Sequence, residues 1–419
     1  MPLGYLNMNA KEGFVMRLVF AATGLRVGRF VALSLALIFL GGSVALACPI
    51  CGVPTVTLPE RLARADVALL AEWVSAKPAK DTAQESTTYE IVQVHRDGTG
   101  KYKAGESVTV GQLTPGKAGN LYLLLGQKDD KLGTRWEIGP ALAVTETGYQ
   151  YIIQAPSPET PAEKRLAYFV KFLEFPDLTI ANDAFAQFVN APTKDIAAVA
   201  GKLPREKIRA WLADPKTPIT RQSGYGLMLG LCGGADEAKF LERQIAKIDP
   251  ERQTGLEGIM FGYLLLAGEQ GLASIEKAYL ANPRAPDGKV YPAFLAIRYF
   301  WSYGNGKISQ PRLQQALRLL IERPELAESA IVMLAEWKDW GLHERLMKLY
   351  DSKGQSESSL KTAIIRYMIA STKDVPKADG AKSEKETPAH VIAGRKCLDE
   401  LRERDSKLVA ETEKYFYLK

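Results

Sequence analysis

The chain has 419 residues, of which 46% are hydrophobic and 24% are charged, and its formal net charge is +6. This length allows two or three domains of ordinary size, and the composition excludes a wholly disordered chain. The first 47 residues carry a net charge of +3, which leaves +3 for the remainder. Because no dense basic stripe interleaved with aromatic residues occurs, the sequence argues against binding to nucleic acid.

The first 47 residues have the features of an export signal. Three arginines precede an almost wholly apolar stretch, residues 30–40. Ala45 and Ala47 then supply small side chains at the two positions that a signal peptidase inspects. We therefore expect residues 1–47 to be a signal peptide and the remainder to be exported, to the periplasm or to the extracellular space.

Two alternatives stay open for this leader. Residues 30–47 carry no charge and reach about the minimum length of a membrane span, so an uncleaved anchor with an exported C-terminal bulk is the first. Any membrane contact of the protein would then run through this segment. A lipoprotein signal is the second and is less well matched, because Ala45 rather than leucine stands three residues before Cys48.

Cys48 and Cys51 follow the leader directly, in the sequence CPIC. A redox pair needs a helix N-terminus to stabilise its thiolate, and residues 52–54, Gly-Val-Pro, oppose an immediate helix. A zinc ribbon needs a second Cys-x-x-Cys pair, which Cys232 and Cys397 do not form. In an oxidising compartment we expect a structural disulfide, with metal or thiol chemistry and lipid attachment as the alternatives.

Residues 62–153 have a β pattern. Short runs rich in valine, leucine, tyrosine and tryptophan alternate with glycine- and proline-containing segments such as TPGKAG. Strands are predicted over residues 65–76, 87–96, 106–113, 120–127 and 135–145. So many short strands favour a small closed barrel or a sandwich, because an open edge of such strands would aggregate. We place this domain at residues 48–155.

At residues 154–165 three prolines interrupt the strands, and the hydrophobic period lengthens from two to about 3.6 residues. A helix is predicted after Pro161, and another over residues 204–215, which prolines bracket. The apolar face of the first consists of Leu166, Phe169, Val170 and Leu173. From here the chain reads as helical almost to its end.

The helical part is repetitive. Five apolar helices with few charges recur, and four of them are followed by a short break and an amphipathic partner. Their centres are Met228, Leu265, Tyr299, Met333 and Ile365, in steps of 37, 34, 34 and 32 residues. A helix pair of this length cannot bury its apolar face alone, so we expect stacked pairs over residues 160–371.

The remaining C-terminal segment divides in two. Residues 372–388 are polar and of low complexity, which predicts a flexible linker. Residues 389–419 predict a closing helical hairpin rich in lysine, arginine and glutamate, the polar outer face that a terminal repeat needs.

Three resemblances follow. Residues 165–371 resemble HEAT-like α-solenoids through repeated helices such as LMLGLCG and AIIRY, although the steps are uneven and shorter than the HEAT period. The segment from Cys48 to about residue 153 resembles the netrin/TIMP-type OB barrel: a cysteine motif, a proline-containing segment, then ARADVALLAEWV as first strand. The whole chain resembles exported bacterial proteins that begin with CPxC and to which no activity is attached.

These resemblances imply an α+β multidomain protein, with a small OB-like β-barrel followed by a HEAT-like all-α solenoid. The netrin/TIMP family uses Cys-x-Cys and further cysteines within the barrel. This chain has Cys-x-x-Cys and no cysteine between Cys51 and Cys232, so the disulfide plan of that family does not carry over.

The most site-like stretch of the helical part is AEWKDWGLHERL, residues 335–346. The candidate partner-binding residues are Glu336, Trp337, Asp339, Trp340 and His343. The three ionisable ones are spaced to lie near one another, and the two tryptophans suit a recognition surface. The alternative is that the tryptophans pack between adjacent repeats while the charges stay in solvent.

No catalytic motif occurs in the sequence, which has three histidines and lacks Gly-x-Ser-x-Gly, His-Glu-x-x-His and a phosphate-binding loop. We therefore expect no catalytic residue, no metal and no cofactor. The favoured hypothesis is a non-enzymatic exported protein that binds a protein or a cell-envelope component on its helical-repeat surface. The alternatives are an envelope thiol-disulfide or metal-handling protein acting through Cys48 and Cys51, and an enzyme with scattered carboxylates.

Overall fold

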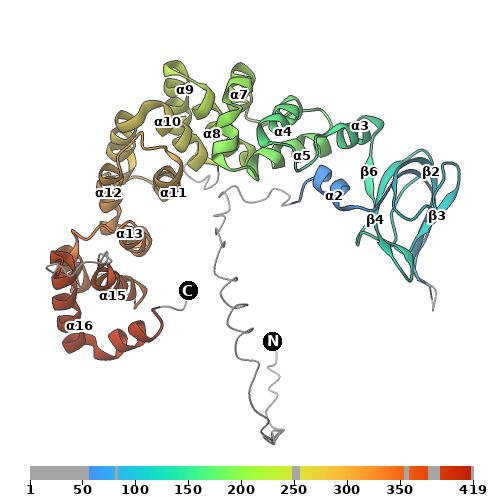
Figure 1. Ribbon diagram of the computed structural model, residues 1–419. Helices are drawn as coiled ribbons and strands as arrows, with labels where there is room; N and C mark the ends of the chain where they lie inside the picture. Colours follow the sequence, from blue (N-terminus) through green and yellow to red (C-terminus); the bar gives the residue numbers. More distant parts are fainter. Residues whose placement is uncertain (1–55, 81–83, 248–254, 353–357, 376–386, 417–419) are drawn as a thin grey trace, which may run out of the picture. The chain divides into compact units, whose positions relative to one another are not determined.

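The computed structural model describes residues 56–80, 84–247, 255–352, 358–375 and 387–416 (Figure 1). The predictions made for the leader and for Cys48 and Cys51 lie outside these residues. The described residues form a mixed protein with one six-stranded antiparallel sheet and many helices, so the expected α+β class is confirmed at this level.

The sheet has the strand order β3-β2-β1-β4-β5, and β6 also pairs with β4. The strands are β1 (Val67–Lys77), β2 (Ser86–Asp97), β3 (Ser107–Val110), β4 (Leu121–Asp129), β5 (Gly133–Trp136) and β6 (Leu142–Val144). Every predicted strand segment is found, but the last, expected over 135–145, forms two strands. Gly139, with φ of 101°, and Pro140 interrupt it, because neither residue sustains a ladder.

The sheet is not a closed barrel, which corrects the OB-barrel prediction. Within the described residues β3 pairs with β2 alone, and β5 and β6 pair with β4 alone, so no ladder joins the two ends of the sheet. β3 ends after four residues, which leaves too little strand for a ladder across the gap. A single side-chain hydrogen bond links the two ends of the sheet: the amide of Gln112, after β3, donates to the carbonyl of Glu137, after β5, at 2.6 Å.

The helical part begins at α3, and α2 precedes the sheet. The helices are α2 (Leu58–Arg64), α3 (Glu146–Gln154), α4 (Ala162–Phe169), η1 (Val170–Phe172), α5 (Leu178–Val189), α6 (Thr193–Ala198), η2 (Ala200–Lys202), α7 (Arg205–Ala213), α8 (Ile219–Cys232), α9 (Ala235–Lys247), α10 (Leu256–Ile275), η3 (Glu276–Leu280), α11 (Asp287–Tyr303), α12 (Gln310–Arg318), η4 (Leu319–Glu322), α13 (Pro324–Glu336), α14 (His343–Tyr350), α15 (Ser358–Lys373) and α16 (Ala389–Lys414).

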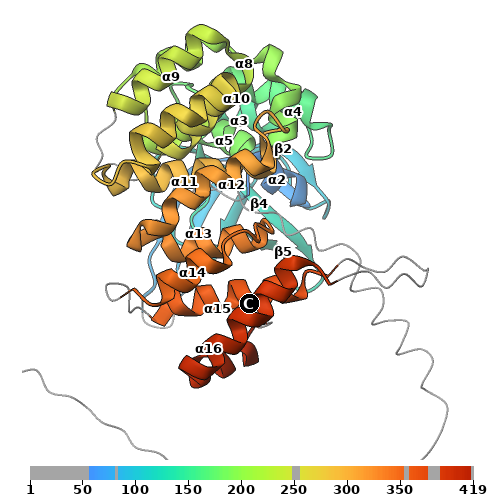
Figure 2. The same cartoon turned by 90° about the vertical axis from the view of Figure 1, so that its left-hand side faces the viewer.

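The five predicted apolar helices are α8, α10, α11, α13 and α15. Their amphipathic partners are found too. The break expected inside α10 lies at Gly268, which adopts φ of 57°. The turn expected in the C-terminal hairpin lies at Asp405, a non-helical residue within α16. The longest helices pack in pairs along the chain, α8 on α10, α10 on α11, α13 on α15 and α15 on α16 (Figure 2).

The strands at the centre of the sheet are buried on both faces. On one face, Leu70 and Leu123 join the core that continues into the helices, and on the other, Leu69 and Leu124 join a separate core inside the curled sheet. Burial on both sides explains why β1 and β4 read as continuous apolar runs rather than as an alternation.

The contact between α8 and α10 is built from glycines. A Cβ atom added to Gly262 would lie 2.0 Å from the Gly226 carbonyl oxygen, and one added to Gly230 would lie 2.4 Å from the Gly262 Cα atom. Only glycine lets two helix backbones approach so closely. The spacing of four residues, Gly226 to Gly230 and Gly258 to Gly262, is the sequence signature of this contact.

One described helix, Leu256–Leu280, is long and apolar enough to cross a membrane by length and composition. However, 56% of its apolar window is buried inside the protein. It packs against α8, α9 and α11. We therefore interpret it as a core helix.

Basic side chains bind the carbonyl groups at the ends of several helices. Arg96 of β2 donates to the Ala65 carbonyl after α2 at 2.6 Å. Lys307 donates to the Leu265 carbonyl, just before the break in α10, and Arg323 donates to the Tyr279 carbonyl in η3. The last carbonyls of a helix have no partner within it and carry its partial negative charge, so these cations stabilise the ends while joining neighbouring elements.

Candidate functional site

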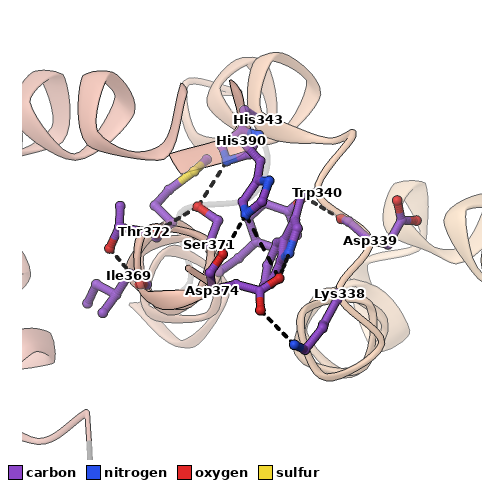
Figure 3. Close-up of polar contacts among 11 residues, drawn as sticks. Lys338, Asp339, Trp340, His343, Ile369, Ser371, Thr372, Asp374 and His390 are labelled. Carbon is purple, nitrogen blue, oxygen red and sulfur yellow. Dashed lines mark hydrogen bonds and ion pairs between the residues drawn. The ribbon is translucent and has the colours of Figure 1, made fainter. Parts of the chain in front are cut away.

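The predicted site residues lie at the turn between α13 and α14, against the end of α15 and the start of α16 (Figure 3). The turn follows a Schellman motif, in which Asp339 N–H donates to the Leu334 carbonyl and Lys338 N–H to the Ala335 carbonyl. Lys338 takes the left-handed position, with φ of 55°, where glycine is usual. This reversal directs Asp339 toward α12 and Trp340 toward α15.

Trp337 packs between neighbouring helices. Its ring stacks on that of Trp301 in α11, with centroids 4.0 Å apart and an interplanar angle of 4°, and the side chain is only 8% exposed. Its carbonyl accepts a hydrogen bond from the Gln314 amide at 2.9 Å. Glu336, the last residue of α13, is exposed.

Asp339 is buried and paired. Its carboxylate accepts two hydrogen bonds from the Arg318 guanidinium of α12, at 2.7 and 2.5 Å. This bidentate bond raises the pKa of Arg318. The Asp339 carbonyl also accepts the Tyr367 hydroxyl of α15 at 2.5 Å. The residue therefore ties α12 and α15 to the turn.

Asp374, just after α15, collects three neighbours. Its carboxylate accepts from Lys338 Nζ at 2.6 Å and from the Trp340 indole at 2.7 Å, and these bonds lower its pKa. His390 of α16 stacks on Trp340 with centroids 5.9 Å apart and donates to the Asp374 carbonyl at 2.9 Å (Figure 3). Aromatic and charged groups thus hold α16 against the turn.

His343 and Ser371 form the arrangement that most resembles nucleophilic catalysis, with Nε2 3.0 Å from the hydroxyl oxygen. Ser371 is fully buried, and its hydroxyl also lies 2.8 Å from the Met368 carbonyl. A Cβ atom on Gly394 of α16 would approach the hydroxyl to 2.3 Å, so α16 seals it. No substrate can reach Ser371, and the contact is structural.

Burial lowers the pKa of His343, and a backbone hydrogen bond to Trp340 opposes the shift. His343 therefore stays neutral at pH 7 and serves as a hydrogen-bonding group.

The structure gathers the five predicted residues at one turn but does not join their ionisable groups. Asp339 binds Arg318, whereas His343 contacts Ser371. Trp337, Asp339 and His343 are buried, Trp340 is half-buried and Glu336 is exposed. Their role in binding a partner stays a prediction, and only Glu336 and the edge of Trp340 face solvent.

Sequence reasoning missed a buried carboxylate on α5. Asp183 is 5% exposed; its Oδ1 accepts the Leu58 amide of α2 at 2.6 Å and its Oδ2 accepts the Tyr151 hydroxyl of α3 at 2.7 Å. Burial raises its pKa to about 6, against the opposing effect of those two bonds. The available signal was a polar pair, Asn182 and Asp183, flanked by alanines in the middle of a mostly apolar helix.

A second buried polar centre lies nearby in the sequence. Arg221 of α8 is 3% exposed and donates to Glu174 at 2.7 Å and to the Asn182 side chain at 2.6 Å. The Tyr225 hydroxyl also donates to Glu174. Here the buried charge has a counter-charge, so the centre joins the segment after η1 to α5 and α8 without an isolated ion.

Two hollows in the described part of the chain differ in size and depth. One, beneath residues 137–141, holds about 30 Å³, room for one water molecule. The other, of about 380 Å³, is a shallow opening lined by residues 200, 201 and 203–207 and by Cys232. Burial raises the pKa of the Cys232 thiol to about 11, so it is a poor nucleophile at neutral pH. Across the described residues no three His, Cys, Asp or Glu side chains group to hold a metal ion.

Comparison of the chain with family models, with curated proteins and with solved structures found no match.

Proposed function

We propose that the chain is an exported binding protein, whose stacked helix pairs, resembling a HEAT-like solenoid, present a surface to another protein or to a component of the cell envelope. The observation that carries this proposal is the order of the helix contacts. Among the apolar helices, α8 packs on α10, α10 on α11 and α13 on α15, while α12 joins α11 to α13, and their apolar faces form one continuous core. Such arrays form extended surfaces suited to binding.

The polar groups support the same interpretation. Asp339, Asp374 and His343 are each engaged in holding helices together. None of these bonds leaves a group directed into an open cleft. The alternative thiol or metal function rests on Cys48 and Cys51, which lie outside the described residues, so no contact in the structure bears on it.

The proposal is tested with a photo-crosslinking amino acid at Glu336 in the full-length protein, expressed in intact cells. We expect a discrete crosslinked partner, identified by mass spectrometry, that the same probe at Lys131, an exposed residue between β4 and β5, does not capture. Identical capture from both sites, or none from Glu336 and from further exposed sites on α9, α12 and α14, would contradict it.

A double substitution of Cys48 and Cys51 by serine separates the two functions. If the protein binds through its helices, the crosslink at Glu336 persists in this variant. If the crosslink is lost while the helices remain folded by circular dichroism, the cysteine-based function is favoured instead.

A further inference from the structure

Helix α2 is bound from both ends by other parts of the chain. At its start the Leu58 amide donates to Asp183 of α5 at 2.6 Å, and after its end Arg96 of β2 donates to the Ala65 carbonyl at 2.6 Å. Leu58 and Asp183 are 125 residues apart in the sequence. This short helix therefore connects the sheet to the helical part through a few identifiable hydrogen bonds.

The charges around Asp183 leave its carboxylate without a bound cation. From α2, Glu60 and Arg61 face it, and from α3 the Tyr151 hydroxyl does. The Arg61 guanidinium is hydrogen-bonded to Glu137 instead, and Glu60 adds a second negative charge while accepting the Thr57 amide at 2.9 Å. An ionised Asp183 is thus stabilised mainly by two neutral hydrogen-bond donors, and the more distant Arg61 charge opposes that of Glu60.

We propose that Asp183 is a proton-controlled latch, which fastens α2 to α3 and α5 more tightly when its carboxyl group takes up a proton. Closing α2 over Asp183 removes the carboxylate from water, and this desolvation disfavours the ionised form. The pKa of the carboxyl is accordingly about 6 in the closed state, compared with its ordinary value of 3.8. Opening returns the group to water and releases the proton.

Both bonds of the latch survive protonation. Oδ1 still accepts the Leu58 amide, while the acid proton on Oδ2 is donated to the Tyr151 hydroxyl oxygen, which can accept as well as donate. Burial raises the pKa of Tyr151, so its hydroxyl stays neutral throughout. Protonation removes the desolvated charge and reverses the bond to Tyr151, whose own O–H then no longer donates to Asp183. Removal of the charge is the larger effect, because burial outweighs the opposing hydrogen bonds.

The size of the effect follows from proton linkage. The opening constant is the equilibrium ratio of the open to the closed state of α2. Between pH 3.8 and about pH 6, the pKa values of Asp183 in the open and closed states, it rises about tenfold for each unit of pH, and above pH 6 it levels off. Full deprotonation therefore loosens the latch about 100-fold. The closed state is favoured in mild acid and relaxes near neutrality.

The test is hydrogen exchange of the backbone amides of residues 56–66 in the full-length protein from pH 4 to pH 7.5, corrected for intrinsic exchange with an unstructured peptide. We expect the opening constant of wild type to rise with pH and to level off near pH 6. Asp183→Asn keeps an acceptor for Leu58 and has no charge, so its opening constant is expected to be independent of pH. The matched control is Asp177→Asn, on the same helix but half-exposed, and it should follow wild type.

A flat profile in wild type, or a slope in Asp183→Asn equal to that of wild type, would overturn the latch. Tyr151→Phe provides a second measurement that does not alter Asp183 itself. It removes a hydrogen bond that favours the ionised carboxylate, so the level-off point should move to higher pH. No movement in a folded Tyr151→Phe protein counts against the proposal.

Discussion

Two buried ionisable side chains, Asp183 on α5 and His343 on α14, occupy similar surroundings and are expected to respond to acid in opposite ways. They are 5% and 7% exposed, and each contacts a buried hydroxyl, that of Tyr151 and that of Ser371. Burial raises the pKa of Asp183 and lowers that of His343, because in each case desolvation disfavours the charged form. The sign of the charge, and not the degree of burial, sets the direction.

The two pKa shifts determine how the stability of the protein depends on pH. The folded state binds a proton at Asp183 more strongly than the unfolded chain, so its contribution to the free energy of unfolding grows as pH falls from about 6 toward 3.8. The folded state resists protonation of His343, so stability is lost as pH falls below the ordinary value of 6.5. Acid therefore strengthens the contacts at α2 and weakens those at α14.

The largest effect should come from a third buried centre, in which the charge is paired. Arg221→Met leaves Glu174, 24% exposed at its side chain, without its cation. Loss of one partner of a buried pair costs about 3–5 kcal/mol in the free energy of unfolding, measured by urea denaturation at pH 7. Arg345→Met, which breaks an exposed pair with Glu322, is the control and should cost less than about 1 kcal/mol. Equal losses in the two variants would show that the buried charge adds nothing.

The next effect tests how α16 closes over His343. Gly394→Ala places a Cβ atom 2.3 Å from the Ser371 hydroxyl oxygen, which must push the helices apart and disturb the contact with His343. Overpacking of this kind costs about 1–3 kcal/mol. Gly201→Ala, where an added Cβ atom meets no other group within 4 Å, is the control and should be nearly neutral in thermal denaturation.

A smaller effect separates the two pH responses. His343→Gln should cost about 1 kcal/mol at pH 7, the net value of a buried hydrogen bond, because glutamine reaches Ser371 with altered geometry. The informative measurement is the melting temperature at pH 5 relative to pH 7. Wild type should lose stability through this site on acidification, and the variant should lose less. An unchanged pH response would mean that His343 is not the group that titrates.

The smallest effect concerns the exposed edge of the same cluster. Lys338→Met removes the ion pair with Asp374 from a side chain that is 67% exposed, and we expect a change within about 0.5 kcal/mol. Trp340 and His390 remain in contact with Asp374 and should hold it in place. A loss comparable to that of Gly394→Ala would show that the charge, rather than the aromatic packing, secures α16.

Local patterns located the elements well. The change of hydrophobic period at residues 154–165 separated the strands from most of the helices, but α3 lies before it, within the residues whose pattern had predicted strands. The break at Gly268 and the turn at Asp405 fell where the apolar pattern was interrupted. These features are local because side chains three or four residues apart share a helix face, and those two apart share a face of a strand.

The candidate site was located less completely. The stretch that contains Trp337 and His343 does lie at one turn, but its partners, Trp301 and Ser371, come from other helices. The sequence could not show that a tryptophan of α11 would stack there, because such a contact depends on the register of one helix against the next. Trp337, Asp339 and His343 are buried because neighbouring helices pack on the turn in that register.

By itself the sequence indicated most of the strands and the apolar helices, since these depend on the spacing of neighbouring side chains, but it assigned α3 to the β region and merged β5 with β6. Only the tertiary structure decided that the sheet stays open, that glycines of α8 meet those of α10, and that Asp183 meets Leu58. These contacts join residues far apart along the chain, and the free energy that selects them belongs to the packed whole and not to any single segment.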